Sequence, residues 1–174
     1  QRTIQSAWER KVCALKHLPN RQSMRLPNFD YSSQGPYFVT IVLYRREPLF
    51  GQVTREGVME LSNAGKMIAG TWQQLAHRYD STFLDSYIVM PDHVHGIITL
   101  GITDQGRPVT SLATVLQWFK TVTGKRYGEG VASQQWPRYS RFLWQRGYYE
   151  HVIRNEAAFQ EKAAYIEANP YRCS

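Results

Sequence analysis

Residues 87–100 read Tyr87-Ile88-Val89-Met90-Pro91-Asp92-His93-Val94-His95-Gly96-Ile97-Ile98-Thr99-Leu100. Two apolar runs flank Pro91 and Asp92, which predicts two strands joined by a tight turn. Successive side chains of a strand point to opposite faces, so His93 and His95 share one face and Val94 lies on the other. Such a pair of imidazoles can bind a divalent metal ion; the alternative is two hydrogen-bonded histidines on a sheet face. Alternation turns Asp92 away from the neighbouring histidine, so we expect it to be a turn residue and not a ligand.

The apolar pattern on either side of this hairpin predicts the element order β-α-β-β-α-β-α. We expect strands over 37–44, 83–90, 93–100 and 142–153, a short accessory strand within 49–53, and helices over 59–79, 111–123 and from Asn155 to Pro170. Gly124 is placed to end the second helix, and 127–141 is expected to be a loop. The order is close to the ferredoxin-like pattern, so we predict an α+β fold: an antiparallel sheet with helices packed on one side.

Charge is distributed unevenly along the 174 residues, which carry a net charge of +7. Residues 1–26 hold six Lys or Arg against one acid, residues 107–174 hold ten against five, and the middle holds five against eight. This predicts a basic N-terminal extension over 1–35, a single domain over 36–174, and a polyanionic partner; the alternative is a generally basic surface. No apolar run approaches membrane-spanning length, so no membrane partner is expected. Cys13 and Cys173 are expected to be free thiols of a reducing cytoplasm.

The last predicted helix carries a polar strip beside its apolar one. Its inward stripe consists of Phe159, Ala163 and Ile166. At 3.6 residues per turn Tyr165 falls well away from that stripe, with Lys162 one turn before it and Asn169 one turn after it. A tyrosine between a cation and an amide is typical of a functional site; the alternative is a tyrosine that packs at the edge of the core.

Four separated blocks of the sequence resemble the REP-associated tyrosine transposases, relatives of the single-tyrosine insertion-sequence transposases in the HUH superfamily of single-strand DNA endonucleases. The blocks are residues 23–44, 87–100, 144–154 and 165–170. The resemblance implies that Tyr165 is the nucleophile, that His93 and His95 are metal ligands with Asn169 as the third, and that the metal is Mg²⁺ or Mn²⁺. A phenol has an ordinary pKa of about 10, and Lys162 could favour its phenolate; the alternative is a solvated helix charge.

The same resemblance implies a bacterial, nucleoid-associated enzyme that cuts and rejoins single-stranded or hairpin DNA through a 5′-phosphotyrosine intermediate. Aromatic residues for base stacking and cations for phosphates are candidates for DNA binding. These candidates are Arg25, Lys120, Lys125, Arg126, Trp144, Arg146, Tyr148 and Arg154. The alternative for the strand aromatics is core packing.

Three other functions are weighed against this one. They are a hairpin-binding relative that does not cut, a nuclease of the replication-initiator type, and a structural zinc protein. The zinc alternative is disfavoured because no third His or Cys stands at suitable spacing. The resemblance leaves the oligomeric state open between a dimer with exchanged tyrosine helices, as in insertion-sequence relatives, and a monomer, as in REP-associated ones, and favours the monomer.

Overall fold

The computed structural model describes residues 34–101, 110–133 and 135–172. The extension predicted for residues 1–35 lies almost entirely outside the described residues, as does Arg25. Within the described part, no helix is both long enough and apolar enough to cross a membrane.

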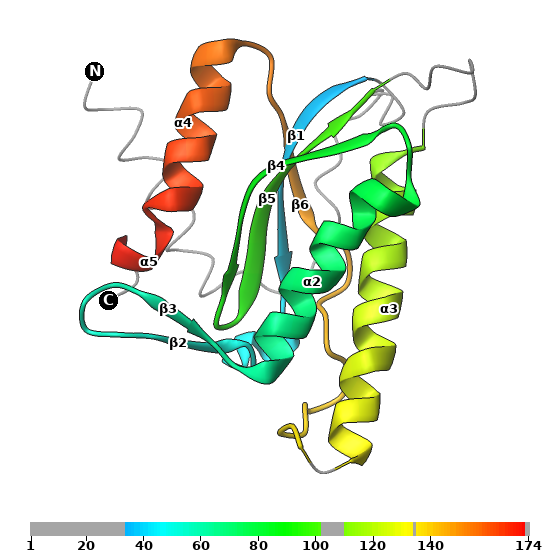
Figure 1. The fold of residues 1–174 in the computed structure, drawn as a ribbon, viewed down its shortest axis with the longest axis vertical. Helices are drawn as coiled ribbons and strands as arrows, with labels where there is room; N and C mark the ends of the chain where they lie inside the picture. Colours follow the sequence, from blue (N-terminus) through cyan, green and yellow to red (C-terminus); the bar gives the residue numbers. More distant parts are fainter. Residues whose placement is uncertain (1–33, 102–109, 134, 173–174) are drawn as a thin grey trace.

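Four strands form one antiparallel sheet in the order β4-β5-β1-β6 (Figure 1). They are β1 (Gly35–Val42), β4 (Thr82–Met90), β5 (His93–Leu100) and β6 (Tyr149–Val152). This is the strand order of the ferredoxin-like pattern, and the predicted α+β class is confirmed. The predicted hairpin of β4 and β5 is also confirmed, with Met90 paired to His93. Because β5 lies between β4 and β1, the strand with the histidines is held from both sides.

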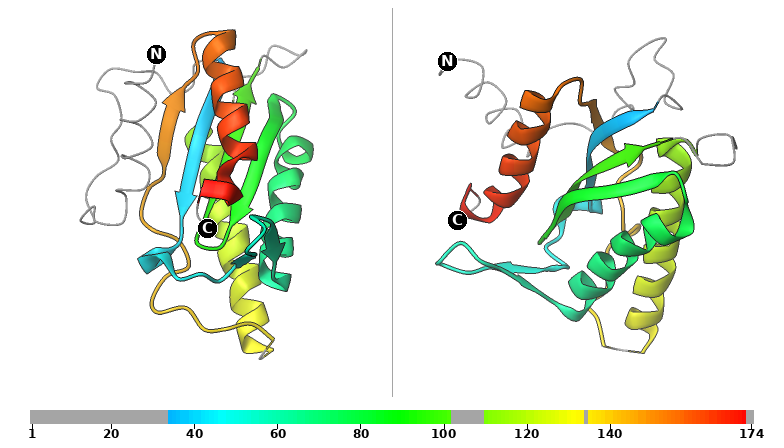
Figure 2. Two further views of the ribbon diagram at one scale, coloured as in Figure 1. Left: turned by 90° about the vertical axis from the view of Figure 1, so that its left-hand side faces the viewer. Right: turned by 45° about the horizontal axis from the view of Figure 1, so that its top comes forward.

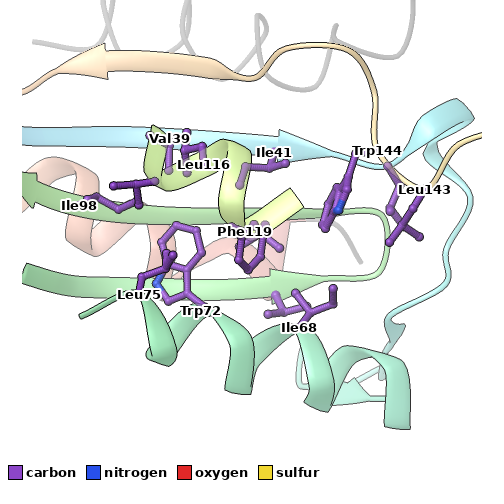
Figure 3. Close-up of a cluster of buried hydrophobic side chains, with 14 of the residues drawn as sticks. Val39, Ile41, Ile68, Trp72, Leu75, Ile98, Leu116, Phe119, Leu143 and Trp144 are labelled. Atoms are coloured by element: carbon purple, nitrogen blue, oxygen red, sulfur yellow. The ribbon is translucent and has the colours of Figure 1, made fainter. Parts of the chain in front are cut away.

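Two long helices cover one face of the sheet. They are α2 (Asn63–Arg78) and α3 (Leu112–Ala132). Each begins at a serine, Ser62 or Ser111, whose hydroxyl accepts a hydrogen bond from a backbone N–H of the first turn. Their apolar stripes meet the sheet around Trp72 and Phe119, whose rings lie edge to face 5.4 Å apart (Figure 3). This layer is the main hydrophobic core.

The last helix, α4 (Glu156–Glu167), lies on the opposite face of the sheet, followed by the single turn α5 (Asn169–Arg172). Figures 1 and 2 show α4 across the sheet from α2 and α3. We expected all helices on one side, and the placement of the last one is corrected. The reason is that the central strands are apolar on both faces: Phe38 and Ile97 point away from the main core and are covered by Ile166 in a second cluster.

Two helix boundaries differ from the sequence prediction. The helix expected from residue 59 begins only at Asn63, because β3 (Met59–Leu61) pairs with β2 (Gly51–Val53) in a separate hairpin. The helix expected to end at Gly124 continues to Ala132. One glycine costs a helix only about 1 kcal/mol, and the fully buried Tyr127 offsets that cost by packing in the core, where its hydroxyl donates to the Pro137 carbonyl.

The boundaries of the last strand and the last helix also differ. The strand predicted over 142–153 is reduced to the four residues of β6, because Gly147 adopts a left-handed φ of 74° that breaks the extended run. The helix predicted to stop at Pro170 ends at Glu167, and Pro170 lies within α5. Asn155 is the N-cap, as predicted, and accepts from the backbone N–H of Ala158.

Gly96→Ala is expected to destabilise the protein strongly. A Cβ at this position of β5 would collide with the ring of Trp72, which is completely buried and has no space to retreat. Overpacking of this kind typically costs about 1–3 kcal/mol. Thermal or urea unfolding measures the effect, with Gly70→Ala on α2 as the control, since a Cβ there meets no atom within 4 Å. An unchanged free energy of unfolding in the Gly96 variant would show that Trp72 repacks.

Candidate active site

His93 and His95 project together from the face of β5 that α4 covers. Their ring centroids are 4.5 Å apart at an interplanar angle of 77°. Both side chains are buried, and Val94 packs in the main core on the other face, as strand alternation predicted. The ring of His95 stacks on Phe38 of β1 at 5.4 Å, which restricts its rotation. Two imidazoles are thus held side by side on a central strand.

Each of these imidazoles has its Nδ1 atom engaged by a neighbour. His93 Nδ1 lies 2.5 Å from Asp92 Oδ1, and His95 Nδ1 lies 2.7 Å from Thr40 Oγ1 on β1. The other Asp92 oxygen accepts from Arg46 Nη1 at 2.9 Å. Partners that engage one ring nitrogen fix the ring's tautomer and orientation, which leaves Nε2 as the atom available to a ligand. Both histidines therefore offer Nε2 from the same face.

The surroundings of the site shift the pKa values of His95 and Asp92. Burial, with smaller contributions from His93 and Arg46, holds the pKa of His95 well below its ordinary value, so its imidazole is neutral at pH 7. Burial alone would raise the pKa of Asp92. Its hydrogen bond to His93 and the charges of His93 and Arg46 outweigh that effect, and the pKa lies below its usual range. Asp92 is thus a carboxylate that accepts the Nδ1–H of His93.

A divalent metal ion fits the donor atoms present. His95 Nε2 is buried with no hydrogen-bond partner among the described residues, and a buried polar atom without a partner is costly unless a ligand satisfies it. No group of three His, Cys, Asp or Glu side chains with metal-binding geometry occurs in the described ranges. Within these ranges, a third protein ligand would be of another type, such as an amide oxygen. Two imidazoles with further oxygen ligands suit Mg²⁺ or Mn²⁺ and also Zn²⁺.

Tyr165 lies on α4 beside the histidine pair. Its ring centroid is 5.5 Å from that of His95 and 6.0 Å from that of Phe38, in edge-to-face arrangements. Asn169 is buried at the start of α5, one turn further along the same strip. Lys162 is buried as well, with 8% of its side chain exposed, and its Nζ donates to Glu161 Oε1. The alternative that Lys162 is a solvated charge is wrong.

The structure separates the DNA-binding candidates of α3 from this site. Lys120, Lys125 and Arg126 belong to α3, across the sheet from the histidines. Lys120 donates to the carbonyls of Gln145 and Gly147, and burial lowers its pKa to about 8. Arg126 donates to Thr71 and Gln74 and ties α3 to α2, while Lys125 is exposed.

The remaining candidates lie on the chain leading into β6 and just beyond it. Trp144 is 7% exposed, packs against Phe50 and Phe119, and donates from Nε1 to Thr123 Oγ1. Its predicted place on a stacking platform is corrected: it is a core residue, as aromatic residues in strands usually are. Tyr148 is half-buried against the main core. Arg146 and Arg154 are exposed.

Thr40 and Arg46 were missed by sequence reasoning. They lie 55 and 46 residues from their partners along the chain, so no local pattern links them to the site. The role of Asp92 had a weak signal, since it directly precedes His93 at a turn. Asp92 is a turn residue, as predicted, but the expectation that alternation turns it away from the neighbouring histidine is wrong. Because the turn interrupts the strand, its Oδ1 lies 2.5 Å from His93 Nδ1 and orients that imidazole.

Asp92→Asn is expected to lower the affinity for Mn²⁺ by about 10- to 100-fold, the usual effect of removing a partner that orients a metal-binding histidine. The amide keeps the shape of the turn but loses the charge that holds His93 and Arg46. Calorimetric titration of Mn²⁺ in the absence of DNA measures the loss.

Asp80→Asn is the matched control, because Asp80 is exposed in the connection from α2 to β4. Its affinity for Mn²⁺ should equal that of the parent. Equal affinities in both variants would show that Asp92 serves the turn only.

The family model described as "Transposase IS200 like" matches residues 33–169. An uncharacterized protein of Haemophilus influenzae is 32% identical to this chain over 163 residues, which cover 87% of this chain and 88% of that protein. The matched region contains the whole sheet, both histidines and Tyr165.

Two solved structures share the fold. The first is described as the structure of the REP-associated tyrosine transposase bound to a REP hairpin; the TM-score is 0.60 at 20% identity, over 87% of this chain and 75% of that one. The second, of a protein from Deinococcus radiodurans R1, has a TM-score of 0.51 at 16% identity, over 83% of this chain and 96% of that one. At these identities the likeness concerns the fold.

Proposed function

This chain belongs to the IS200-like transposase family, and on that premise we propose that it cleaves and rejoins single-stranded DNA at hairpins through a covalent bond to Tyr165. The observation that carries the proposal is the position of Tyr165, whose ring lies 5.5 Å from that of a histidine with its Nδ1 engaged. An enzyme nucleophile beside a bound metal ion is one arrangement that catalyses phosphoryl transfer.

His93 and His95 would hold a Mg²⁺ or Mn²⁺ ion through Nε2, with the amide oxygen of Asn169 as the third ligand. When bound, the ion neutralises charge that develops on the non-bridging oxygens of the cleaved phosphate. Thr40 and Asp92 keep the two imidazoles oriented for this task. The turn containing Asp92 is further held by Arg46.

Tyr165 carries out the covalent step. Its hydroxyl loses a proton, the oxygen attacks phosphorus, and the bond to the 3′ oxygen breaks to leave a 5′-phosphotyrosine and a free 3′-hydroxyl. Attack by a 3′-hydroxyl reverses the step, so the energy of the bond is conserved and no nucleotide hydrolysis is needed. The buried cation of Lys162 stands one helical turn before Tyr165 and would favour the phenolate.

Hairpin DNA is the proposed substrate, because the REP-associated transposase of the same fold was solved with a REP hairpin. Arg146 and Arg154 are exposed on and beyond the approach to β6 and would contact phosphates. The basic residues 1–26, Arg25 among them, would add further contacts from outside the described part of the chain. Lys125 on α3 is exposed and remains a further candidate.

A monomeric site is proposed as well. Tyr165 approaches His95 of its own chain, so the tyrosine helix and the histidine strand meet without exchange between two copies. Dimeric relatives with exchanged helices complete each site with a partner's tyrosine.

Incubation with a labelled hairpin oligonucleotide and Mn²⁺, followed by a denaturing gel, tests the proposal. The expected result is a shortened strand together with a protein–DNA adduct that survives SDS. Binding without either product would identify a hairpin-binding relative that does not cut. Cleavage of an unpaired oligonucleotide but not of hairpins would favour a replication-initiator type of nuclease.

A further inference from the structure

Four side chains form an arginine–aromatic patch next to the metal site: Tyr44, Arg45, Arg141 and Phe142. The rings of Tyr44 and Phe142 lie edge to face at 5.8 Å and 90°. The Arg45 guanidinium lies 5.7 Å from the centre of the Tyr44 ring, and that of Arg141 lies 5.1 Å from the centre of the Phe142 ring. The patch therefore holds two adjoining aromatic rings, each with one guanidinium over it.

The patch joins two chain segments that are far apart in sequence. Tyr44 and Arg45 belong to η2 (Tyr44–Arg46), which follows β1, while Arg141 and Phe142 lie on the approach to β6. Backbone hydrogen bonds hold the segments together: Tyr44 N donates to the Leu143 carbonyl at 2.8 Å, and Gln145 N donates to the Val42 carbonyl at 2.9 Å. The rings are thus presented by a fixed backbone and not by a loose loop.

Phe142 is exposed to an unusual degree for its type. Its exposed fraction is 55%, and within the described ranges only Val58 and Phe83 are comparable among large hydrophobic side chains. Arg45 and Arg141 are also exposed. Phe142 therefore offers open ring surface bordered by charged side chains.

The patch adjoins the histidine pair. Leu43, just before η2, donates its backbone N–H to the Asp92 carbonyl at 2.8 Å. Arg46, just after Arg45, reaches Asp92 and through it His93. Figure 2 shows η2 at the end of β1, the end at which Val42 pairs with His93. The patch therefore lies at the end of the sheet that carries His93.

The charge of the patch suits a polyanion. Arg45 and Arg141 contribute two exposed cations, while the neighbouring Arg46 is paired with Asp92 and the nearby Glu47 accepts a hydrogen bond from the Ser140 hydroxyl. Both Arg45 and Arg46 adopt left-handed backbone angles, with φ of 57° and 54°. Such angles are strained for residues other than glycine and cluster at functional sites.

Resting on the function proposed above, we infer that the arginine–aromatic patch binds unpaired nucleotides of the DNA strand beside the cleaved phosphate. Bases would stack on Phe142 and Tyr44, and Arg45 and Arg141 would contact the flanking phosphates. Aromatic rings interleaved with cations form the general platform for single-stranded nucleic acid, and stacking tolerates any base. The sequence pattern suggested such a platform at Trp144, which is buried, whereas Phe142, two residues before it, is exposed.

Binding of two kinds of hairpin to the Tyr165→Phe protein tests this inference without cleavage. One kind is blunt; the other carries a short single-stranded oligothymidylate extension, on the 5′ side in one probe and on the 3′ side in a second. Fluorescence anisotropy should show that Phe142→Ala weakens binding of one extended hairpin by about tenfold, the usual scale for a lost stacking ring. Binding of the blunt hairpin should be unchanged.

Phe83→Ala is the matched control. Phe83 is 57% exposed but lies at the start of β4, whereas Met90, which pairs with His93, lies at its end. The control variant should bind both kinds of hairpin like the parent. The inference is wrong if Phe142→Ala binds the extended hairpins as tightly as the control, or if an extension adds nothing to the affinity of the parent. It is also wrong if Phe142→Ala alters only self-association in sedimentation, since the patch would then be a protein interface.

Arginine variants supply a second readout. Arg141→Gln and Arg45→Gln should each make the slope of log K against log salt shallower by about one unit for the extended hairpin. Arg78→Gln is the control, because Arg78 also covers a ring, that of Tyr79, but at the C-terminal end of α2. Unchanged slopes in both patch variants would overturn the phosphate contacts. Retained patch-dependent binding in a protein that never cleaves would instead contradict the proposed function alone.

Discussion

Tyr165→Phe is expected to abolish DNA cleavage and the covalent adduct while leaving hairpin binding almost unchanged. The variant loses only the hydroxyl oxygen, so its ring should keep the edge-to-face contacts with His95 and Phe38 that hold α4 on the sheet. Removing the nucleophile of a covalent mechanism typically lowers the rate by about 10⁴-fold or more. Adduct formation in SDS and strand cleavage on a denaturing gel measure the loss.

Tyr149→Phe and Tyr148→Phe are the matched controls for this experiment. Tyr149 begins β6 and pairs with Thr40, so it points to the sheet face that carries the histidines, whereas Tyr148 just before β6 packs against the main core. Each variant should cleave like the parent. An SDS-resistant complex that persists in Tyr165→Phe and disappears in one of the controls would move the nucleophile to that residue.

Replacing His93 or His95 with alanine should remove metal binding and cleavage together. The loss should exceed the roughly 10- to 100-fold effect expected for a partner that only orients a ligand. Chelation of the metal by EDTA should have the same effect on the parent protein, and added Mn²⁺ should reverse it. Calorimetry reports the affinity for Mn²⁺ independently of cleavage, and full activity in EDTA would overturn the metal mechanism.

Asn169→Ala should give a milder loss, because an amide oxygen is a weaker ligand than an imidazole.

A mixture of the Tyr165→Phe and His95→Ala proteins separates a monomeric from a dimeric site. With the site complete in one chain, the mixture should remain inactive, since no molecule has both groups. Regained cleavage in the mixture would show that the tyrosine helix of one copy serves the histidines of another.

Local sequence rules were sufficient for most of the strands and for the amphipathic helices. The β4–β5 hairpin was predictable because β-branched runs on both sides of Pro91 and Asp92 favour strands whatever surrounds them. The stripe of α2 was predictable because the buried residues Ala64, Ile68, Trp72 and Leu75 recur at steps of three and four. Element ends were less predictable: Gly124 does not stop α3 because the buried Tyr127 beyond it stabilises the helix from the core.

The features of the site likewise divide into those set by the local sequence and those set by tertiary packing. Strand alternation by itself placed His93 and His95 on one face, and the helical repeat placed Tyr165 on a strip with Lys162 and Asn169, because both periodicities are properties of the local backbone. Tertiary packing decided that α4 crosses to the second face of the sheet and brings Tyr165 to His95. Tertiary packing also placed Thr40 and Arg46 against the site, buried Trp144, and left Phe142 exposed. These features depend on contacts between segments about 50 to 100 residues apart, and the energies that select such contacts leave no periodic trace in the sequence.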